Sequence, residues 1–155
     1  MKNYLEIGVA TGKHMLEILR DRNVKYVGVD KWEHDTTLEH EVNKLKDWNS
    51  QDKWDEVYKE VLKKVEPYKD RASIIRGSSV DVLPTLVDTF DFIYVDGDHS
   101  YEGAKKDLEL SLPLLKEGGK IIVDDLHYPS VRKAFQEFIQ ENEVKHKGDT
   151  ICVQR

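Results

Sequence analysis

The feature that most constrains the fold is a short apolar strand near the N-terminus that runs directly into a glycine-bracketed turn. Residues 5–12 have the sequence LEIGVATG, and a helical pattern follows Gly12. A second apolar strand, Val24 to Val29, ends at Asp30, eighteen residues beyond Gly12. An acidic side chain at this place can accept hydrogen bonds from both hydroxyls of a ribose whose nucleoside lies along the turn. The pattern therefore predicts an α/β domain that binds a nucleotide-like ligand.

The turn itself differs from a dinucleotide-binding loop. A pyrophosphate requires the pattern G-x-G-x-x-G against a helix N-terminus, but Ala10 stands in place of the middle glycine. The observed spacing is E-x-G-x-x-x-G, which places Glu6 to meet a cationic group. This pattern resembles motif I of the class I S-adenosylmethionine-dependent methyltransferases, whose cofactor carries a sulfonium and an amino group and no phosphate. The alternative is a tight turn in another Rossmann-like domain. The resemblance implies cofactor contacts from Glu6, Gly8, Val9, Gly12 and Asp30.

Composition and charge narrow the class of protein. A chain of 155 residues is most simply one domain, 1–155, that can bury a sizeable core. The net charge of −6 argues against a nucleic-acid backbone as the main partner. The N-terminus has no apolar leader, and no stretch approaches ~20 apolar residues, so no membrane partner is expected. The single cysteine, Cys152, cannot form an internal disulfide. We therefore expect a soluble, cytoplasmic protein.

Strand and helix patterns alternate along the chain, which predicts a mostly parallel sheet with helices on both faces. The expected parallel strands are Tyr4 to Ile7, Lys25 to Val29, Ser73 to Arg76, Phe90 to Val95 and Lys120 to Val123. Val144 to His146 and Thr150 to Gln154 flank a Lys147-Gly148-Asp149 turn, which is typical of an antiparallel hairpin. The resemblance to the methyltransferases also implies an antiparallel hairpin at the C-terminus. The expected fold class is thus α/β, a Rossmann-like methyltransferase fold with a mostly parallel seven-stranded sheet and an antiparallel C-terminal hairpin.

Helices are expected after Gly12, Ser79, Ser100 and Pro129, and Gly118-Gly119 is expected to end the third of them as a C-cap. The alternation of strands and helices is interrupted by a charged helical insertion at about 33–70. This insertion is longer than the crossover between two parallel strands requires. Apolar residues at helical spacing predict two helices there, with Asn49-Ser50 as the break and cap. The first set is Leu38, Val42 and Leu45, and the second is Trp54, Val57, Val61 and Val65. The insertion either packs on the sheet or forms part of a substrate lid or an oligomer contact.

Two of the predicted strands end in acidic residues. Asp96 follows the strand that ends at Val95, and Asp124 and Asp125 follow the one that ends at Val123. Ligands bind at the carboxyl ends of strands in such sheets, so these carboxylates converge if the two strands are neighbours. Two carboxylates about 4 Å apart repel by roughly 4 kcal/mol at an effective dielectric constant near 20. A divalent cation offsets this repulsion, and an all-oxygen site suits Mg²⁺.

The acidic set resembles that of the metal-dependent O-methyltransferases of the catechol and macrolide-sugar types. The resemblance implies that Asp96, Asp124 and Asp125 are metal ligands, with Asp96 also near the cofactor. His99, three residues beyond the first ligand, takes the place of the general base. The alternatives are helix capping by Asp124 or Asp125 and a solvated loop position for His99. His127 is a further candidate for this cleft. The remaining histidines are expected at the surface, namely His14, His34, His40 and His146.

The adenine is expected to lie beside two loops. The resemblance implies backbone and hydroxyl contacts from Gly77, Ser78 and Ser79, which follow the third strand; an N-cap is the alternative role for Ser79. Lys31 and Trp32 directly follow the ribose acid, so one of them is expected to border the adenine. Trp32 is the better candidate for the core.

The predicted acceptor is a hydroxylated small molecule. The chain opens at the first strand, whereas the enzymes that it resembles carry N-terminal helices over the acceptor pocket. We therefore expect an open acceptor side that is covered by the charged insertion, by a second subunit of a homo-oligomer or by the acceptor itself. Three alternatives stay open: a metal-independent methyltransferase, a non-catalytic S-adenosylmethionine-binding protein, and an NAD or nucleotide-sugar enzyme with an unusual turn.

Overall fold

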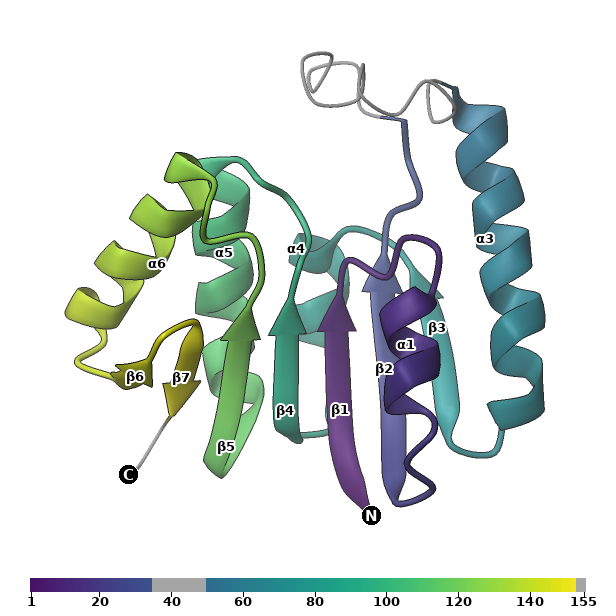
Figure 1. Ribbon diagram of the computed structural model, residues 1–155, viewed down its shortest axis with the longest axis horizontal. Coiled ribbons are helices and arrows are strands. Elements are labelled where there is room, and N and C mark those ends of the chain that lie inside the picture. The colour runs from purple at the N-terminus through teal and green to yellow at the C-terminus, as the bar shows by residue number, and fades with distance from the viewer. Residues whose placement is uncertain (35–49, 153–155) are drawn as a thin grey trace.

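The core of the protein is one seven-stranded sheet with the strand order β3-β2-β1-β4-β5-β7-β6 (Figure 1). The computed structural model describes residues 1–34 and 50–152. The strands β1 (Lys2–Ile7), β2 (Val24–Asp30), β3 (Ala72–Arg76), β4 (Phe90–Val95) and β5 (Leu115–Val123) are parallel. The hairpin of β6 (Lys145–Lys147) and β7 (Thr150–Cys152) is antiparallel and joins β5 through β7. The predicted α/β class and the antiparallel C-terminal hairpin are confirmed.

Helices cover both faces of the sheet (Figure 1). One face packs against α1 (Lys13–Ile18) and α3 (Gln51–Val65), which the 3₁₀ turn η2 (Glu66–Tyr68) follows. The other face packs against α4 (Ser79–Val82), α5 (Tyr101–Ser111) and α6 (Pro129–Glu141), with the 3₁₀ turns η3 (Leu83–Thr85) and η4 (Leu112–Leu114). Side chains alternate between the faces along a strand, so Leu5 and Ile7 face α4 to α6 while Tyr4 faces α1 and α3.

The second half of the charged insertion folds as predicted. α3 begins after Ser50, whose side chain caps it by accepting a hydrogen bond from the amide of Lys53 at 3.4 Å. Val61 and Val65 are buried against the sheet. The first predicted helix, Leu38 to Leu45, and His40 within it lie outside the described residues.

The predicted role of Gly118-Gly119 as a helix C-cap is wrong, because both glycines belong to β5. α5 ends earlier, at Ser111, and the chain enters η4, where Pro113 lacks the amide hydrogen that a continuing helix would need. β5 then pairs Leu115 with Phe90 and Lys120 with Phe92, so the glycines fill an irregularity of the β4–β5 register.

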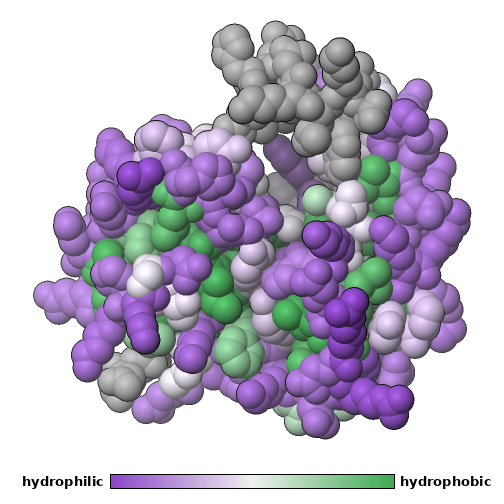
Figure 2. All heavy atoms as spheres, in the orientation of Figure 1, coloured by the Kyte–Doolittle hydropathy of each residue, from purple (hydrophilic) through white to green (hydrophobic). Residues whose placement is uncertain are grey.

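The surface in Figure 2 is predominantly hydrophilic, and its hydrophobic side chains form separate patches. Across residues 1–34 and 50–152, none of the helices combines the length and the apolar character needed to cross a bilayer.

The approach of the loop after β1 to the end of β4 depends on Gly8. This residue has φ +89°, and a Cβ atom on it would lie 1.8 Å from the carbonyl oxygen of Asp96. Only glycine therefore allows the loop after β1 to pass against the backbone at the end of β4. The close approach places Asp96 beside the glycine-bracketed turn.

We expect Gly8→Ala to reduce the free energy of unfolding by about 3 kcal/mol or more, because it combines a steric overlap with an unfavourable φ. Gly118→Ala is the matched control, since Gly118 has φ +73° but a Cβ atom added to it would meet no other atom within 4 Å. The control should lose only about 1 kcal/mol, the cost of the left-handed conformation. Urea denaturation measures both variants, and equal losses would show that the close approach contributes nothing.

Candidate functional site

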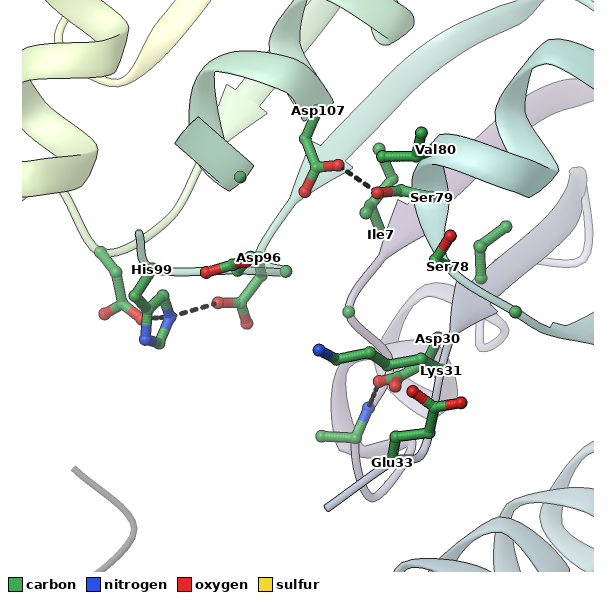
Figure 3. A pocket seen from close by; sticks show the side chains of 18 of the residues that line it. Ile7, Asp30, Lys31, Glu33, Ser78, Ser79, Val80, Asp96, His99 and Asp107 are labelled. Atoms are coloured by element: carbon green, nitrogen blue, oxygen red, sulfur yellow. Dashed lines mark hydrogen bonds and ion pairs between the residues drawn. The ribbon is translucent and has the colours of Figure 1, made fainter. Parts of the chain in front are cut away.

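A cavity of about 490 Å³ opens at the carboxyl ends of the parallel strands (Figure 3). It spans the loops that follow β1 and β4, the two strands between which the strand order reverses, as expected for a ligand site in an open α/β sheet. The lining includes most of the predicted site residues, namely Gly8, Asp30, Lys31, Gly77, Ser78, Ser79, Asp96, His99 and Asp125. It also includes Ala10, Glu33, Trp54, Asp98 and Asp107, which sequence reasoning did not select.

Asp30 is held at the cavity wall by two backbone amides. Its Oδ2 accepts a hydrogen bond from the amide of Ala10 at 2.8 Å, and its Oδ1 accepts one from the amide of Trp32 at 2.8 Å. Both donors have positive φ, 47° for Ala10 and 43° for Trp32, so two turns fold around the carboxylate. Each carboxylate oxygen can accept a further hydrogen bond, which leaves acceptor positions for a diol.

The loop after Asp30 is fixed by residues that sequence reasoning missed. Trp32 is 0% exposed, as expected for a core residue, and its indole donates to the carbonyl of Ala10 at 2.9 Å. The carbonyl of Trp32 accepts from Gln51 and from Arg76, each at 3.0 Å. Arg76 ends β3 and Gln51 begins α3, so these bonds tie the cavity wall to two distant elements.

The loop after β3 carries two serines with different roles. Ser78 is the N-cap of α4: it accepts from the amide of Asp81 at 3.3 Å and donates to the Asp81 carboxylate at 2.7 Å. Ser79 is the first residue of the helix, so the alternative role of Ser79 as an N-cap is not observed. Its hydroxyl instead donates to the carboxylate of Asp107 on α5 (Figure 3).

Asp107 is a buried carboxyl group on α5. It is only 2% exposed, and burial raises its pKa to about 6, against the opposing effects of the Ser79 hydrogen bond and the Lys31 charge. The signal for it was present in the sequence, because Asp107 shares the helix stripe of Ala104, Leu108 and Ser111, which are all buried.

The other end of the cavity holds two carboxylates and an imidazole. Nε2 of His99 lies 2.9 Å from Oδ2 of Asp125 and 3.7 Å from Oδ1 of Asp96. Burial, together with the charges of Asp124 and Asp125, raises the pKa of Asp96, while His99 lowers it. Ligand atoms of Asp96, His99 and Asp125 all lie within 4.8 Å of one another, which is close enough to hold one metal ion.

Asp124 departs from the predicted convergence of three carboxylates. Its Oδ2 accepts a hydrogen bond from the Tyr94 hydroxyl at 2.5 Å, and its Oδ1 accepts one from the amide of Asp125 at 2.7 Å. The side chain is therefore directed to β4 and does not join the group of Asp96, His99 and Asp125. Neither acid caps α6, because the N-cap is Tyr128 and no side chain caps that end.

Glu6 is directed away from the cavity. It is 1% exposed, and it accepts hydrogen bonds from the hydroxyl of Tyr26 and from Nδ1 of His14, the latter at 3.2 Å. The basic partner of Glu6 is thus His14, whose pKa the Glu6 hydrogen bond raises. His14, expected at the surface, is partly buried: its side chain is 30% exposed and its ring lies against Tyr4 of β1 and Tyr94 of β4.

Three other predicted positions also lie outside the lining. Val9 is buried in the core below α1, and Gly12 precedes α1. His127 is not a lining residue either; its side chain is 69% exposed and lies 3.4 Å from Asp125.

Known methyltransferases are similar to this chain in sequence pattern and in fold. Residues 5–126 match the family of methyltransferase domains. No curated protein matches the chain. The structure of the O-methyltransferase NovP is similar, with a TM-score of 0.69 and 20% identity, over 100% of this chain and 72% of NovP.

Two further solved structures share the fold. The O-methyltransferase TomG from Streptomyces achromogenes, in complex with SAM, has a TM-score of 0.66 and 15% identity, over 99% of this chain and 74% of TomG. The calicheamicin methyltransferase CalS11 has a TM-score of 0.65 and 17% identity, over 99% of this chain and 72% of CalS11.

We expect Asp107 to make stability depend on pH. Its pKa is higher in the folded chain, about 6, than in the unfolded chain, so its stabilising contribution is lost as the pH rises through that range. From about pH 5 to about pH 8, the free energy of unfolding should fall by about 1 kcal/mol relative to that of Asp107→Asn. Urea denaturation at both pH values measures this difference. The exposed Asp81→Asn is the control, and a pH-independent difference for Asp107→Asn would contradict the expectation.

Proposed function

The chain belongs to the family of methyltransferase domains, and we propose that it transfers the methyl group of S-adenosylmethionine to a hydroxyl oxygen of a small molecule. The observation that carries this proposal is the arrangement of one cavity. Asp30 offers acceptors for a ribose at one side, and the cluster of Asp96, His99 and Asp125 lies at the other. A nucleoside cofactor and an acceptor would thus meet within a single site.

The charge of the cavity favours a sulfonium over a phosphate. The lining that the structure describes contains six acids, Asp30, Glu33, Asp96, Asp98, Asp107 and Asp125, and one lysine, Lys31. Such a surface attracts a cationic ligand and repels a pyrophosphate. The NAD and nucleotide-sugar alternatives are therefore disfavoured on electrostatic grounds. The complexes of TomG with SAM and of the Podospora anserina methyltransferase PaMTH1 with SAH support the same ligand class.

His99 is the residue that we assign to proton removal. Asp125 fixes the orientation of its ring through the 2.9 Å contact, and Asp96 lies close on the cavity side. When the imidazole takes the proton of the acceptor hydroxyl, these two carboxylates stabilise the resulting imidazolium. S-adenosylmethionine supplies an electrophilic methyl group, which passes from sulfur to the acceptor oxygen. The cavity contributes mainly by holding the reacting atoms about 3 Å apart and in line.

The acids that would hold a divalent cation are Asp96 and Asp125, with Asp124 as a third after release from Tyr94. The site fits such an ion, because burial and neighbouring charges raise the pKa of Asp96 and leave negative charge for a cation to stabilise. Oxygen donors favour Mg²⁺. Once bound, the ion would supply Lewis acidity that lowers the pKa of the acceptor hydroxyl.

The ribose contact predicts a selective loss of nucleoside affinity. Asp30→Asn should weaken S-adenosylhomocysteine binding by about tenfold or more, because a charged acceptor and one loop hydrogen bond are lost. Isothermal titration calorimetry measures the affinity. Asp88→Asn is the control, since Asp88 is an exposed partner of Lys25 at 3.3 Å. Undiminished affinity in Asp30→Asn would remove the ribose from this side of the cavity.

Metal dependence has a separate test. EDTA should abolish methyl transfer and added Mg²⁺ should restore it, while S-adenosylhomocysteine binding stays the same. Asp125→Asn should weaken Mn²⁺ binding, measured by calorimetry, by at least about tenfold. Substitution of residues that only hydrogen-bond to metal ligands already lowers metal affinity by that factor, and Asp125 would be a ligand itself. Turnover that persists in EDTA would instead support the metal-independent alternative, in which His99 alone neutralises the acids. Nucleoside binding without turnover on any polyol or catechol would support a non-catalytic binding protein.

A further inference from the structure

The loop after Asp30 is held in an unfavourable conformation by an arginine that does not line the cavity. Trp32 has φ +43°, which is rare for a side chain of this size, so contacts from outside the loop must maintain it. The carbonyl of Trp32 accepts a hydrogen bond from the guanidinium of Arg76 at 3.0 Å, and the carbonyl of Lys31 accepts one from Nε of Arg76 at 3.3 Å. Arg76 thus binds the loop at two successive carbonyls.

The turn at Trp32 directs a hydrogen-bond donor at Asp30. The amide of Trp32 donates to Oδ1 of Asp30 at 2.8 Å, and its indole donates to the carbonyl of Ala10 at 2.9 Å. The amide of Ala10 donates in turn to Oδ2 of Asp30 (Figure 3). The conformation of the turn therefore determines the position and the rotation of the carboxylate that we assign to the ribose.

Arg76 is itself held by α3. Asp55 accepts a hydrogen bond from the Arg76 guanidinium, which also lies 4.9 Å from the centre of the Tyr58 ring. Gln51 donates to the Asp55 carboxylate at 2.9 Å and to the Trp32 carbonyl at 3.0 Å. Side chains from β3 and α3 therefore converge on one carbonyl, and the positive charge of Arg76 has its counter-charge in Asp55, outside the cavity.

On the basis of the proposed function, we propose that Arg76 is a positioning residue for ribose binding, because it maintains the turn at Trp32 that orients Asp30. Arg76 is absent from the cavity lining and is paired with Asp55, so it acts through the loop and not on the ligand. Without Arg76, the turn can relax from its positive φ and withdraw the Trp32 amide from Asp30. The carboxylate then loses the fixed orientation that two hydroxyls require, and binding must restore it.

A double-mutant cycle with Asp30 tests this inference. Calorimetry measures S-adenosylhomocysteine binding for the unmodified protein, Arg76→Ala, Asp30→Asn and the double variant. Arg76→Ala should weaken binding by about fivefold or more, because the carboxylate is no longer preorganised. In the Asp30→Asn background the same substitution should weaken binding by less than about twofold, since the contact that Arg76 orients is already impaired. A merely structural role would lower the affinity by the same factor in both backgrounds.

Arg71→Ala is the matched control. Arg71 directly precedes β3, at the end of the strand away from the cavity, and does not line it. Its guanidinium donates to the backbone carbonyls of Leu19, Asp21 and Val24, and lies 5.3 Å from the centre of the Tyr68 ring. It makes the same kinds of contact as Arg76, so its loss should lower the free energy of unfolding and leave nucleoside affinity unchanged.

Gln51→Ala is a second, independent variant, because Gln51 reaches the same Trp32 carbonyl from α3. It should also weaken nucleoside binding, and this loss should also shrink in the Asp30→Asn background. Should Arg76→Ala fail to fold, Gln51→Ala decides by the same two criteria.

Two results would overturn the inference and leave the proposed function standing. One is full affinity in Arg76→Ala, and the other is a loss of equal size with and without the Asp30 carboxylate. Failure of the unmodified protein to bind S-adenosylhomocysteine would instead reject the proposed function, and the inference with it.

Discussion

The contact between the loop after β1 and the backbone of Asp96 determines the shape of the site. Because Gly8 has no side chain, the loop passes against the end of β4, where a Cβ atom would meet the Asp96 carbonyl at 1.8 Å. The loop also supplies the Ala10 amide that holds Asp30. Asp30 at the end of β2 and Asp96 after β4 thus face one cavity, although β1 lies between the two strands.

Four of the six acids that line the cavity differ in how far neighbouring groups stabilise their charge. Asp30 accepts hydrogen bonds from two backbone amides. Asp107 accepts one from Ser79, which is too little to offset burial, so its pKa stays raised. Asp125 has the imidazole of His99 at 2.9 Å, while Asp96 has it only at 3.7 Å. Within the group of Asp96, His99 and Asp125, Asp96 is therefore the acid with the most to gain from a further cation.

Sequence reasoning located the site through the strand ends, because residues that follow parallel strands reach one edge whatever their side chains do. Asp30, Ser79, Asp96, His99 and Asp125 were found in this way, and all of them line the cavity. Their roles remain predictions, since a position on a loop does not define the chemistry.

Side-chain direction was harder to predict from the sequence, since it depends on neighbours that are distant along the chain. Glu6 accepts hydrogen bonds from Tyr26 and His14 on the face of the sheet that α1 covers, and no local sequence pattern predicts these partners. Asp107 is buried by the approach of α4 to α5. At Gly118-Gly119, helix-ending and strand-bulge geometries use the same residue type, so composition alone could not separate them.

The orientation of the Asp124 side chain depends on packing at the face of the sheet that α1 covers. Its carboxylate accepts from Tyr94, the ring of Tyr94 lies 4.2 Å from that of His14, and His14 is held by buried Glu6. The packing of α1 on β4 therefore fixes the phenol that holds Asp124 away from Asp96 and Asp125. Glu6 in turn raises the pKa of His14, which favours the protonated imidazole beside it. A cation that recruited Asp124 would compete with the Tyr94 hydrogen bond, so its affinity would be coupled to the packing of α1.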